Sequence, residues 1–149
     1  MIDHIGFPVA DIARSRAFYT AALAPLGIAL VLEVSAEQTG KAAHAGFGRD
    51  GKPGFWIGTG VPLSAGLHVA FTAVDRRSVA AFHAAALAAG GRDNGGPGLR
   101  PHYHPNYFGA FVLDPDGHNI EAVCHRGNRM NEGALPPLDG EVGPEGRVG

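Results

Sequence analysis

The sequence repeats itself at a shift of 64 residues, and this repeat limits the folds that the chain can adopt. Residues 4–11 read HIGFPVAD and residues 68–75 read HVAFTAVD. In the same register, and without a gap, Phe18 matches Phe82. Self-similarity at a fixed spacing indicates one structural unit that occurs twice. We therefore expect two copies of one module.

Each copy begins with the pattern of a strand followed by a helix. Apolar residues alternate with small or polar ones after His4 and again after His68, which is typical of a half-buried strand. An aspartate follows each strand where a helix N-cap is expected, because a short carboxylate accepts the free N–H groups of a first helical turn. The helices are predicted over 12–26 and 76–89, and each ends at glycine.

Three further strands are predicted in each copy. In the first copy they lie near 28–34, 42–48 and 54–58, and in the second copy a weak strand precedes residue 103 and is followed by 107–113 and 118–124. The order βαβββ-βαβββ predicts an α+β fold, a cupped mixed eight-stranded sheet with helices on its outer face. Residues 1–124 form one predicted domain, with modules at about 1–60 and 65–124, and residues 125–149 read as an extended tail.

Composition excludes several classes of protein. Hydrophobic residues make up 45% of the 149 residues and charged residues 17%, which is typical of a globular chain. A net charge of −2 without a basic stripe argues against a nucleic-acid partner. No apolar run approaches the ~20 residues of a membrane span, and the start lacks the features of a signal peptide, so we expect a cytoplasmic protein. The single cysteine, Cys124, excludes an internal disulfide and a cysteine-based zinc site.

Strand parity brings three potential metal ligands to one face. On the last strand Ile120 and Ala122 belong under the helices, so Glu121 belongs in the cup, and by the same parity His4 and His68 face it too. Two imidazoles and one carboxylate could bind Fe(II), Mn(II), Ni(II) or Zn(II) and leave coordination positions open. The alternative for each histidine is a hydrogen-bonded residue of the core or rim.

These residues, together with the segment 114–121, Asp-Pro-Asp-Gly-His-Asn-Ile-Glu, resemble the vicinal oxygen chelate superfamily. That superfamily contains glyoxalase I, extradiol dioxygenases, fosfomycin-resistance transferases and metal-free bleomycin-binding proteins. The resemblance covers about residues 1–124. It implies paired βαβββ modules, metal ligands at His4, His68 and Glu121, and a homodimer, with sites shared between subunits in some members.

The sequence departs from the glyoxalase I pattern at the fourth ligand. The 64-residue shift places Ile57 opposite Glu121, and neither Ile57 nor the neighbouring Trp56 can bind a metal. An open site with three protein ligands is therefore expected, with Ile57 in contact with a substrate. The position of the extradiol dioxygenase tyrosine is Phe111, which we also expect to contact a substrate.

The segment 100–107, RPHYHPNY, gathers unusual side chains before a strand that leads to the cup. His102 and His104 are candidate acid–base groups, and Tyr107 is a third candidate catalytic residue. Arg100 is the cation nearest the predicted cup, and Asn119 shares the face of Glu121, so both are candidate substrate contacts. The alternative is a proline-stiffened loop whose polar groups bind backbone and water.

Two classes of function remain open. The first is a metal-dependent enzyme that acts on a small oxygen-rich molecule by proton transfer, as in lyases and isomerases, or by extradiol-type dioxygenation. The second is a metal-free protein of the bleomycin-resistance type, which binds a small molecule without turnover. An occupied metal site with open positions would separate the two.

Overall fold

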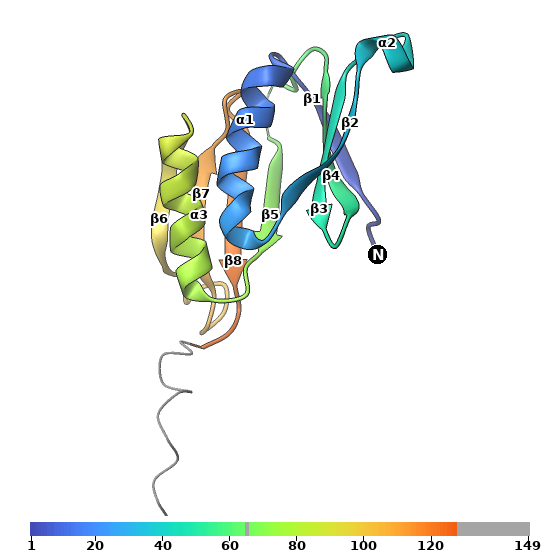
Figure 1. The fold of residues 1–149 in the computed structure, drawn as a ribbon. Coiled ribbons are helices and arrows are strands. Elements are labelled where there is room, and N and C mark those ends of the chain that lie inside the picture. The colour runs from blue at the N-terminus through green and yellow to red at the C-terminus, as the bar shows by residue number, and fades with distance from the viewer. Residues whose placement is uncertain (65, 128–149) are drawn as a thin grey trace, which may run out of the picture.

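The computed structural model describes residues 1–64 and 66–127, and it contains two βαβββ modules (Figure 1). The elements of the first module are β1 (Ile5–Val9), α1 (Ile12–Leu23), the 3₁₀ helix η1 (Ala24–Leu26), β2 (Ala29–Val34), the short α2 (Ala36–Thr39), β3 (His44–Arg49) and β4 (Lys52–Thr59). Those of the second module are β5 (His68–Thr72), α3 (Arg76–Ala88), β6 (Arg92–Leu99), β7 (Phe108–Leu113) and β8 (Asn119–Cys124).

Each module forms its own four-stranded mixed sheet. The strand orders are β1-β4-β3-β2 and β5-β8-β7-β6, and the pairs β1–β4 and β5–β8 are parallel while the others are antiparallel. The predicted α+β class with paired βαβββ modules is confirmed. The eight strands are divided between two sheets and do not close into a barrel.

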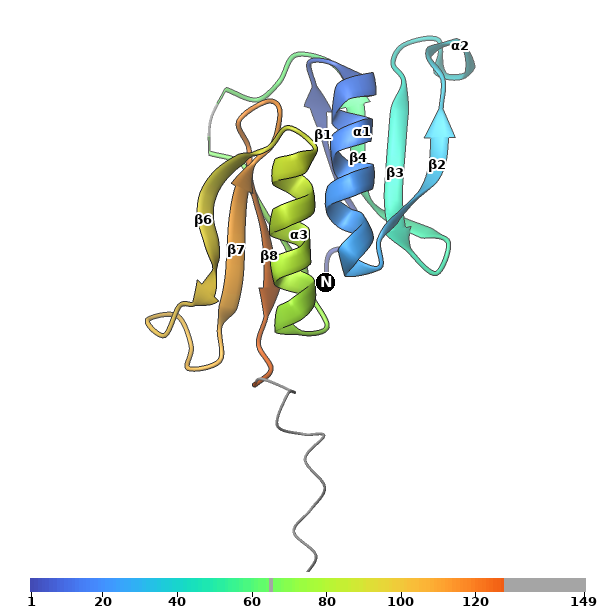
Figure 2. The ribbon, with the colours of Figure 1, turned by 60° about the vertical axis from the view of Figure 1, so that its left-hand side comes forward.

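One helix covers one face of each sheet. Helix α1 lies against the first sheet and α3 against the second, and the two helices contact each other side by side (Figure 2). The opposite face of each sheet is not covered by these helices, and we call these two surfaces the open face of the first sheet and the open face of the second sheet. Functional side chains can therefore be reached from only one side of each sheet.

The helix boundaries follow the predicted caps. The Asp11 carboxylate accepts a hydrogen bond from the backbone N–H of Arg14 at 3.0 Å, and Asp75 accepts one from Ser78 at 2.7 Å. The helix predicted over 12–26 is α1 followed by η1, because Pro25 has no N–H to continue the α-helical pattern. Gly27 ends this segment with φ of 73°, a left-handed conformation that glycine adopts without strain.

The hydrophobic core continues from one module into the other through Phe55. Its ring lies 4.9 Å from that of Tyr19 in α1 and 5.2 Å from that of Phe71, which belongs to β5 of the second module. Aromatic pairs at these separations are stabilising beyond their burial. The two modules therefore share a core within one chain.

The predicted tail falls mostly outside the described residues. Residues 125–127 follow β8 and are exposed, and residues 128–149 lie beyond the part that the structure describes. Among the described residues no helix has the length and apolar character that crossing a membrane requires.

Candidate functional site

The open face of the second sheet carries a buried carboxylate at its centre. Glu121 of β8 pairs with Ala70 of β5 on one side and with Phe111 of β7 on the other. Its neighbours Ile120 and Ala122 belong to the core beneath α3, so parity turns Glu121 the other way, as the sequence predicts. Only 1% of Glu121 is exposed, which requires partners for its charge.

Each oxygen of the Glu121 carboxylate has one partner. His68 of β5 donates from Nε2 to Oε2 at 2.9 Å, and the Tyr107 hydroxyl donates to Oε1. The His68 side chain remains 47% exposed, so one edge of the pair faces solvent. The sequence predicted all three residues, and the structure brings them together in one cluster, which we call the Glu121 cluster.

Tyr107 remains a phenol at neutral pH. Burial, the hydrogen bond to Glu121 and the charge of that carboxylate raise the pKa of Tyr107 to about 12. A protonated phenol can only donate to a carboxylate in this geometry. Tyr107 therefore holds Oε1 of Glu121 in place and keeps the carboxylate oriented toward His68.

A glycine that the sequence analysis did not select makes this cluster possible. A Cβ atom at Gly109 of β7 would lie 3.1 Å from Oε1 of Glu121 and 3.2 Å from Cε1 of Tyr107, closer than ordinary contacts. A larger residue would push the phenol and the carboxylate apart. Glycine inside a strand often marks such close approach, so its position within the predicted strand 107–113 could have identified it from the sequence.

Arg100 and Phe111 form a wall beside the Glu121 cluster. The guanidinium carbon of Arg100 lies 5.4 Å from the centre of the Phe111 ring, and that ring lies 6.1 Å from the His68 ring. Arg100 also donates to the carbonyl oxygens of Gly98 at 2.8 Å and Gly96 at 2.9 Å. Both glycines belong to β6, so these bonds hold the Arg100 guanidinium against the end of that strand, beside the Phe111 ring.

The remaining predicted residues of this module lie around the cluster. Asn119 of β8 accepts a hydrogen bond from Asn94 through its side-chain oxygen at 3.1 Å. His102 and His104 lie in the exposed turn between β6 and β7, where Nδ1 of His104 accepts the backbone N–H of Asn106 at 3.1 Å. Of the three predicted catalytic residues, Tyr107 is the one that the structure places against Glu121.

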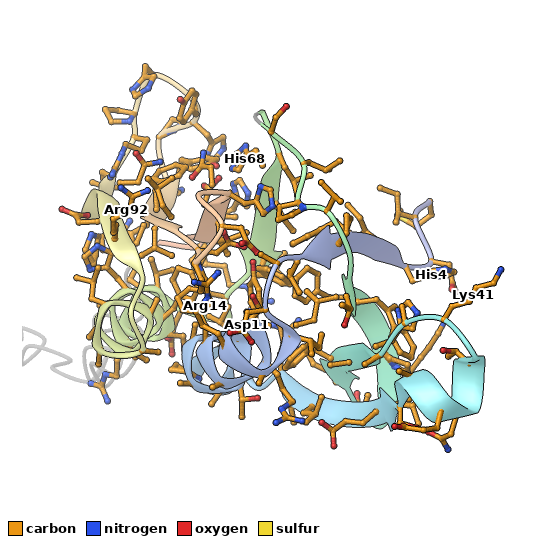
Figure 3. All side chains as sticks on the ribbon, turned by 90° about the horizontal axis from the view of Figure 1, so that it is seen from above. His4, Asp11, Arg14, Lys41, His68 and Arg92 are labelled. Carbon is orange, nitrogen blue, oxygen red and sulfur yellow. The ribbon has the colours of Figure 1, made fainter. Side chains whose placement is uncertain are left out.

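His4 does not join this cluster within one chain. It precedes β1 on the open face of the first sheet, and Figure 3 shows it well apart from His68, near Lys41. Its Nδ1 lies 2.8 Å from a carboxylate oxygen of Asp3. Within residues 1–64 and 66–127 no three His, Cys, Asp or Glu side chains come close enough to hold one metal ion. The single cup that was expected to hold all three ligands is therefore split between two sheets.

Strand register changes the residue that is equivalent to Glu121. In the second module Glu121 pairs with Ala70, and the repeat equates Ala70 with Gly6. Gly6 pairs with Trp56, so Trp56 holds the equivalent position. The first module is one residue shorter than the second between these paired positions, and an ungapped shift misses this difference.

The expectation for Ile57 is corrected accordingly. Ile57 pairs with Phe7, is 0% exposed, and belongs to the core beneath α1 rather than to the open face. A difference of one residue reverses the side of the sheet to which a side chain points. The absence of a fourth protein ligand at this position still follows, because the Trp56 indole does not bind metals.

The open face of the first sheet is hollow and largely uncharged. A cavity of about 310 Å³ over this face is lined in part by Gly6, Pro8, His44, Trp56, Gly58 and Thr59. A Cβ at Gly46 would lie 2.9 Å from ring atoms of Trp56, so this glycine makes room for the indole. His44 at the start of β3 was not selected from the sequence, although alternation along that strand places it with Gly46 and Gly48 on this face.

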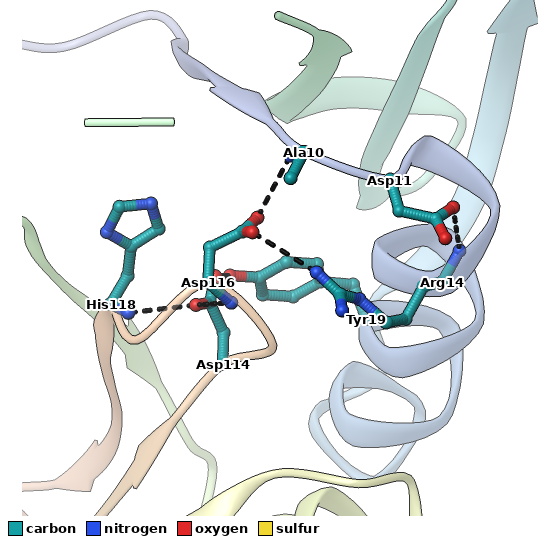
Figure 4. A network of polar contacts seen from close by, with 7 residues as sticks. All are labelled: Ala10, Asp11, Arg14, Tyr19, Asp114, Asp116 and His118. Atoms are coloured by element: carbon teal, nitrogen blue, oxygen red, sulfur yellow. Dashed lines mark hydrogen bonds and ion pairs between the residues drawn. The ribbon is translucent and has the colours of Figure 1, made fainter. Parts of the chain in front are cut away.

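The turn that precedes Glu121 is anchored to the first module (Figure 4). Asp114 accepts hydrogen bonds from the backbone of Asp116 at 2.9 Å and of His118 at 2.8 Å, which closes the turn between β7 and β8. The Tyr19 hydroxyl of α1 donates to the same carboxylate at 2.5 Å. Burial and the charge of Asp114 raise the pKa of Tyr19 well above its ordinary value, so this phenol stays a donor. The first module thereby fixes the start of the Glu121 strand.

The fold is thus a pair of βαβββ modules, with a His–Glu pair on the open face of the second sheet. A family model described as the Glyoxalase/Bleomycin resistance protein/Dioxygenase superfamily matches residues 1–122. The chain belongs to this superfamily.

Solved structures agree with this assignment. A glyoxalase/bleomycin resistance protein from Albidiferax ferrireducens T118 is 30% identical with a TM-score of 0.65, and the match covers 81% of this chain and 95% of that one. A glyoxalase I variant from Zea mays is 25% identical with a TM-score of 0.63, covering 82% of this chain and 46% of that one, so this chain spans about half of that protein. A glyoxalase-related enzyme from Fulvimarina pelagi, 21% identical with a TM-score of 0.59 over 83% of this chain and 86% of that one, shares the fold. A search of curated proteins found no match.

Proposed function

We propose that this protein is a divalent-metal-dependent enzyme that acts on a small oxygen-rich molecule. The observation that carries the proposal is the pair of His68 and Glu121 on an open sheet face, where Nε2 of the histidine lies 2.9 Å from Oε2 of the carboxylate. An imidazole nitrogen and a carboxylate oxygen are the donors that Fe(II), Mn(II), Ni(II) and Zn(II) accept. Glu121 is a nearly fully buried carboxylate, and its charge favours a cation at this position.

The third ligand is His4 of a partner subunit. His4 and His68 hold equivalent positions in the two modules, on open faces that one chain leaves apart. A symmetric dimer would place the first sheet of each copy against the second sheet of the other, and it would do so twice. Two equivalent sites would then form, each with His68 and Glu121 of one subunit and His4 of the partner subunit.

The metal, when bound, would polarise substrate oxygens at positions that no protein ligand takes. Around it Tyr107 orients Glu121 and offers a phenolic proton, while Phe111 provides an aromatic surface beside His68. His102 and His104 lie on the turn that leads into Tyr107, and we assign them the acid–base role in proton transfer or dioxygen insertion. Asn119 and Arg100 lie close enough to the cluster to orient a polar substrate.

A second function is favoured by a specific feature of the Glu121 cluster. Both carboxylate oxygens already have protein partners, so the site satisfies its buried charge without a metal. This arrangement would suit a metal-free protein that binds a small molecule between the open faces. Metal content separates the two functions.

The test is metal analysis of protein purified without added metal, combined with a mixing experiment. We expect stoichiometric metal in the wild type and loss of metal in His4→Ala and in Glu121→Gln. The control His83→Ala, in a histidine of α3 that pairs with Asp93 of β6, should keep its metal. Absence of metal from the wild type, with ligand binding unchanged in His4→Ala, would overturn the enzyme proposal.

Co-expression of His4→Ala and Glu121→Gln tests whether the site is shared between subunits. A mixed dimer of His4→Ala and Glu121→Gln subunits contains one site with both changes and one intact site. Random pairing should therefore restore about a quarter of the wild-type metal content. No restoration in a sample shown to contain mixed dimers would contradict sites shared between subunits.

A further inference from the structure

A second hollow lies between the two modules, and His125 in its lining has its ring 5.1 Å from that of Tyr107. It has a volume of about 360 Å³, and its lining includes Leu26, Arg49, Thr72, Val123, His125 and Arg126. Leu26 and Arg49 belong to the first module, and the others belong to or directly follow strands of the second. We call it the inter-module pocket. Its size is within the range of pockets that bind small molecules.

The inter-module pocket is positively charged. Two arginines and a histidine line it, and its lining contains no carboxylate. Within the described part of the chain, neither Arg49 nor Arg126 forms an ion pair, whereas Arg14 pairs with Asp116 and Arg16 pairs with Glu33. Uncompensated guanidinium groups facing one hollow create a potential that attracts anions.

Neutral groups hold Arg49 in position. Its Nε and Nη2 donate to the carbonyl oxygen of Leu26 at 3.2 and 2.9 Å, and Nη2 also donates to the carbonyl oxygen of Thr72 at 2.7 Å. Its Nη1 donates to the Thr72 hydroxyl oxygen at 3.3 Å, so the hydroxyl proton is available to another acceptor. These bonds fix the guanidinium across the module boundary without neutralising its charge.

We propose that the inter-module pocket binds the phosphate group of a small organic phosphate. Arg126 supplies guanidinium N–H groups to the phosphate oxygens, in a geometry that a guanidinium matches better than a point charge does. Arg49 adds its charge and the one Nη1–H that its bonds to Leu26 and Thr72 leave over, and the Thr72 hydroxyl donates as well. Leu26 and Val123 form the apolar part of the lining, which contacts the organic part of the ligand. This site does not depend on the metal proposed at Glu121.

A bound phosphate would join the two modules. It contacts Arg49 of the first module and Thr72 and Arg126 of the second, and any ligand that binds only the folded state raises its stability. Thr72 lies on the strand of His68, and Val123 lies on the strand of Glu121, so occupancy also steadies both strands that carry the Glu121 cluster.

The test is an isothermal calorimetric titration of the full chain with inorganic phosphate at constant ionic strength. We expect saturable binding to the wild type and at least a tenfold larger Kd in Arg126→Ala, because the variant loses a guanidinium that contacts the phosphate. Arg126 is exposed, so its removal leaves the core intact. Arg92→Ala, an exposed arginine on the opposite end of the second sheet, is the matched control and should bind as the wild type does.

A second variant guards against a change in folding. Arg49→Lys keeps the positive charge but loses the guanidinium bonds to Leu26 and Thr72, and it should weaken phosphate binding while circular dichroism stays that of the wild type. Phenyl phosphate should bind the wild type more tightly than inorganic phosphate. Equal phosphate affinity in Arg126→Ala and Arg92→Ala, or no binding to the wild type at about 20 mM phosphate, would overturn the proposal.

Discussion

The two modules have the same succession of strands and helix, but their open faces are chemically different. On the first sheet the face is made of glycines around Trp56 and His44, with His4 at its edge. On the second sheet the equivalent face holds Glu121, with partners on both of its oxygens. One backbone plan thus carries an uncharged hollow in one copy and a charged cluster in the other.

The position of a residue in the alternation of its strand, not its type, decides whether its side chain reaches an open face. A single residue fewer in the first module turns Ile57 into the core and Trp56 outward, whereas the ungapped repeat suggested the reverse. Because the side-chain period of a strand is two, one residue is enough to exchange the two faces. The contrast between the modules can be tested position by position.

The largest effect is expected from placing a carboxylate at the two competing positions. Ile57→Glu buries a charge in the core beneath α1, and we expect a loss of about 3–5 kcal/mol in the free energy of unfolding. Trp56→Glu places the same carboxylate on the open face, and the loss should be about 1–2 kcal/mol, mainly from the indole packing. Urea denaturation of both variants measures the difference.

The same pair of variants tests the equivalence of Trp56 and Glu121. If Trp56 is equivalent to Glu121, Trp56→Glu adds a fourth ligand to the proposed metal site and should tighten metal binding, while Ile57→Glu should not. Similar stability losses in the two variants would contradict the register that the structure shows.

A smaller effect is expected from adding one methyl group to a strand glycine in each module. At Gly109 the added carbon meets Glu121 and Tyr107 at 3.1 and 3.2 Å, so Gly109→Ala should cost about 1–3 kcal/mol through displacement of the cluster. Gly54→Ala on the first sheet is the control, since a Cβ added there would lie 3.8 Å from its nearest neighbour, the Asp3 carbonyl oxygen. That variant should change stability by about 0.5 kcal/mol or less, as thermal unfolding can show.

The smallest effect concerns the protonation of Tyr107. Its pKa is raised from 10.0 to about 12, so the fold favours the neutral phenol. Its contribution to the free energy of unfolding is complete below the pKa of tyrosine in the unfolded chain, about 10, and is lost as pH rises through about 12. Phenolate absorbance of the wild type minus that of Tyr107→Phe should rise near pH 12 in the native protein and near pH 10 in guanidinium. A rise near pH 10 in both would show that Tyr107 does not contact the Glu121 carboxylate.

Much of the fold was predictable from local patterns. The repeat, the alternation of strands and the capping aspartates Asp11 and Asp75 act over a few residues, and the structure confirms the elements that they indicate. The cluster of His68, Tyr107 and Glu121 was also reachable, because parity and order along the second module place all three on one face. Helix α2 was missed, although Ser35 and Gln38 form a capping box there.

The relative placement of the modules was not predictable in this way. No local pattern says whether two four-stranded sheets join into one cup, and the separation of His4 from His68 depends on how α1 and α3 contact each other. The inter-module pocket arises from the same contact, because Arg49 and Thr72 meet only after both modules have folded. These features depend on residues that are far apart in the chain.

The βαβββ repeat, the faces of the second module and the types of side chain that could bind a metal follow from the sequence without the structure. Short-range geometry settles these properties, since strand alternation and helix capping require only neighbouring residues. The tertiary structure alone decided that Trp56 rather than Ile57 is equivalent to Glu121, that Gly109 admits the Tyr107 phenol, and that His4 lies apart from its expected partners. Register between strands and packing between modules are long-range properties, and a single residue of length or a single missing Cβ is enough to change them.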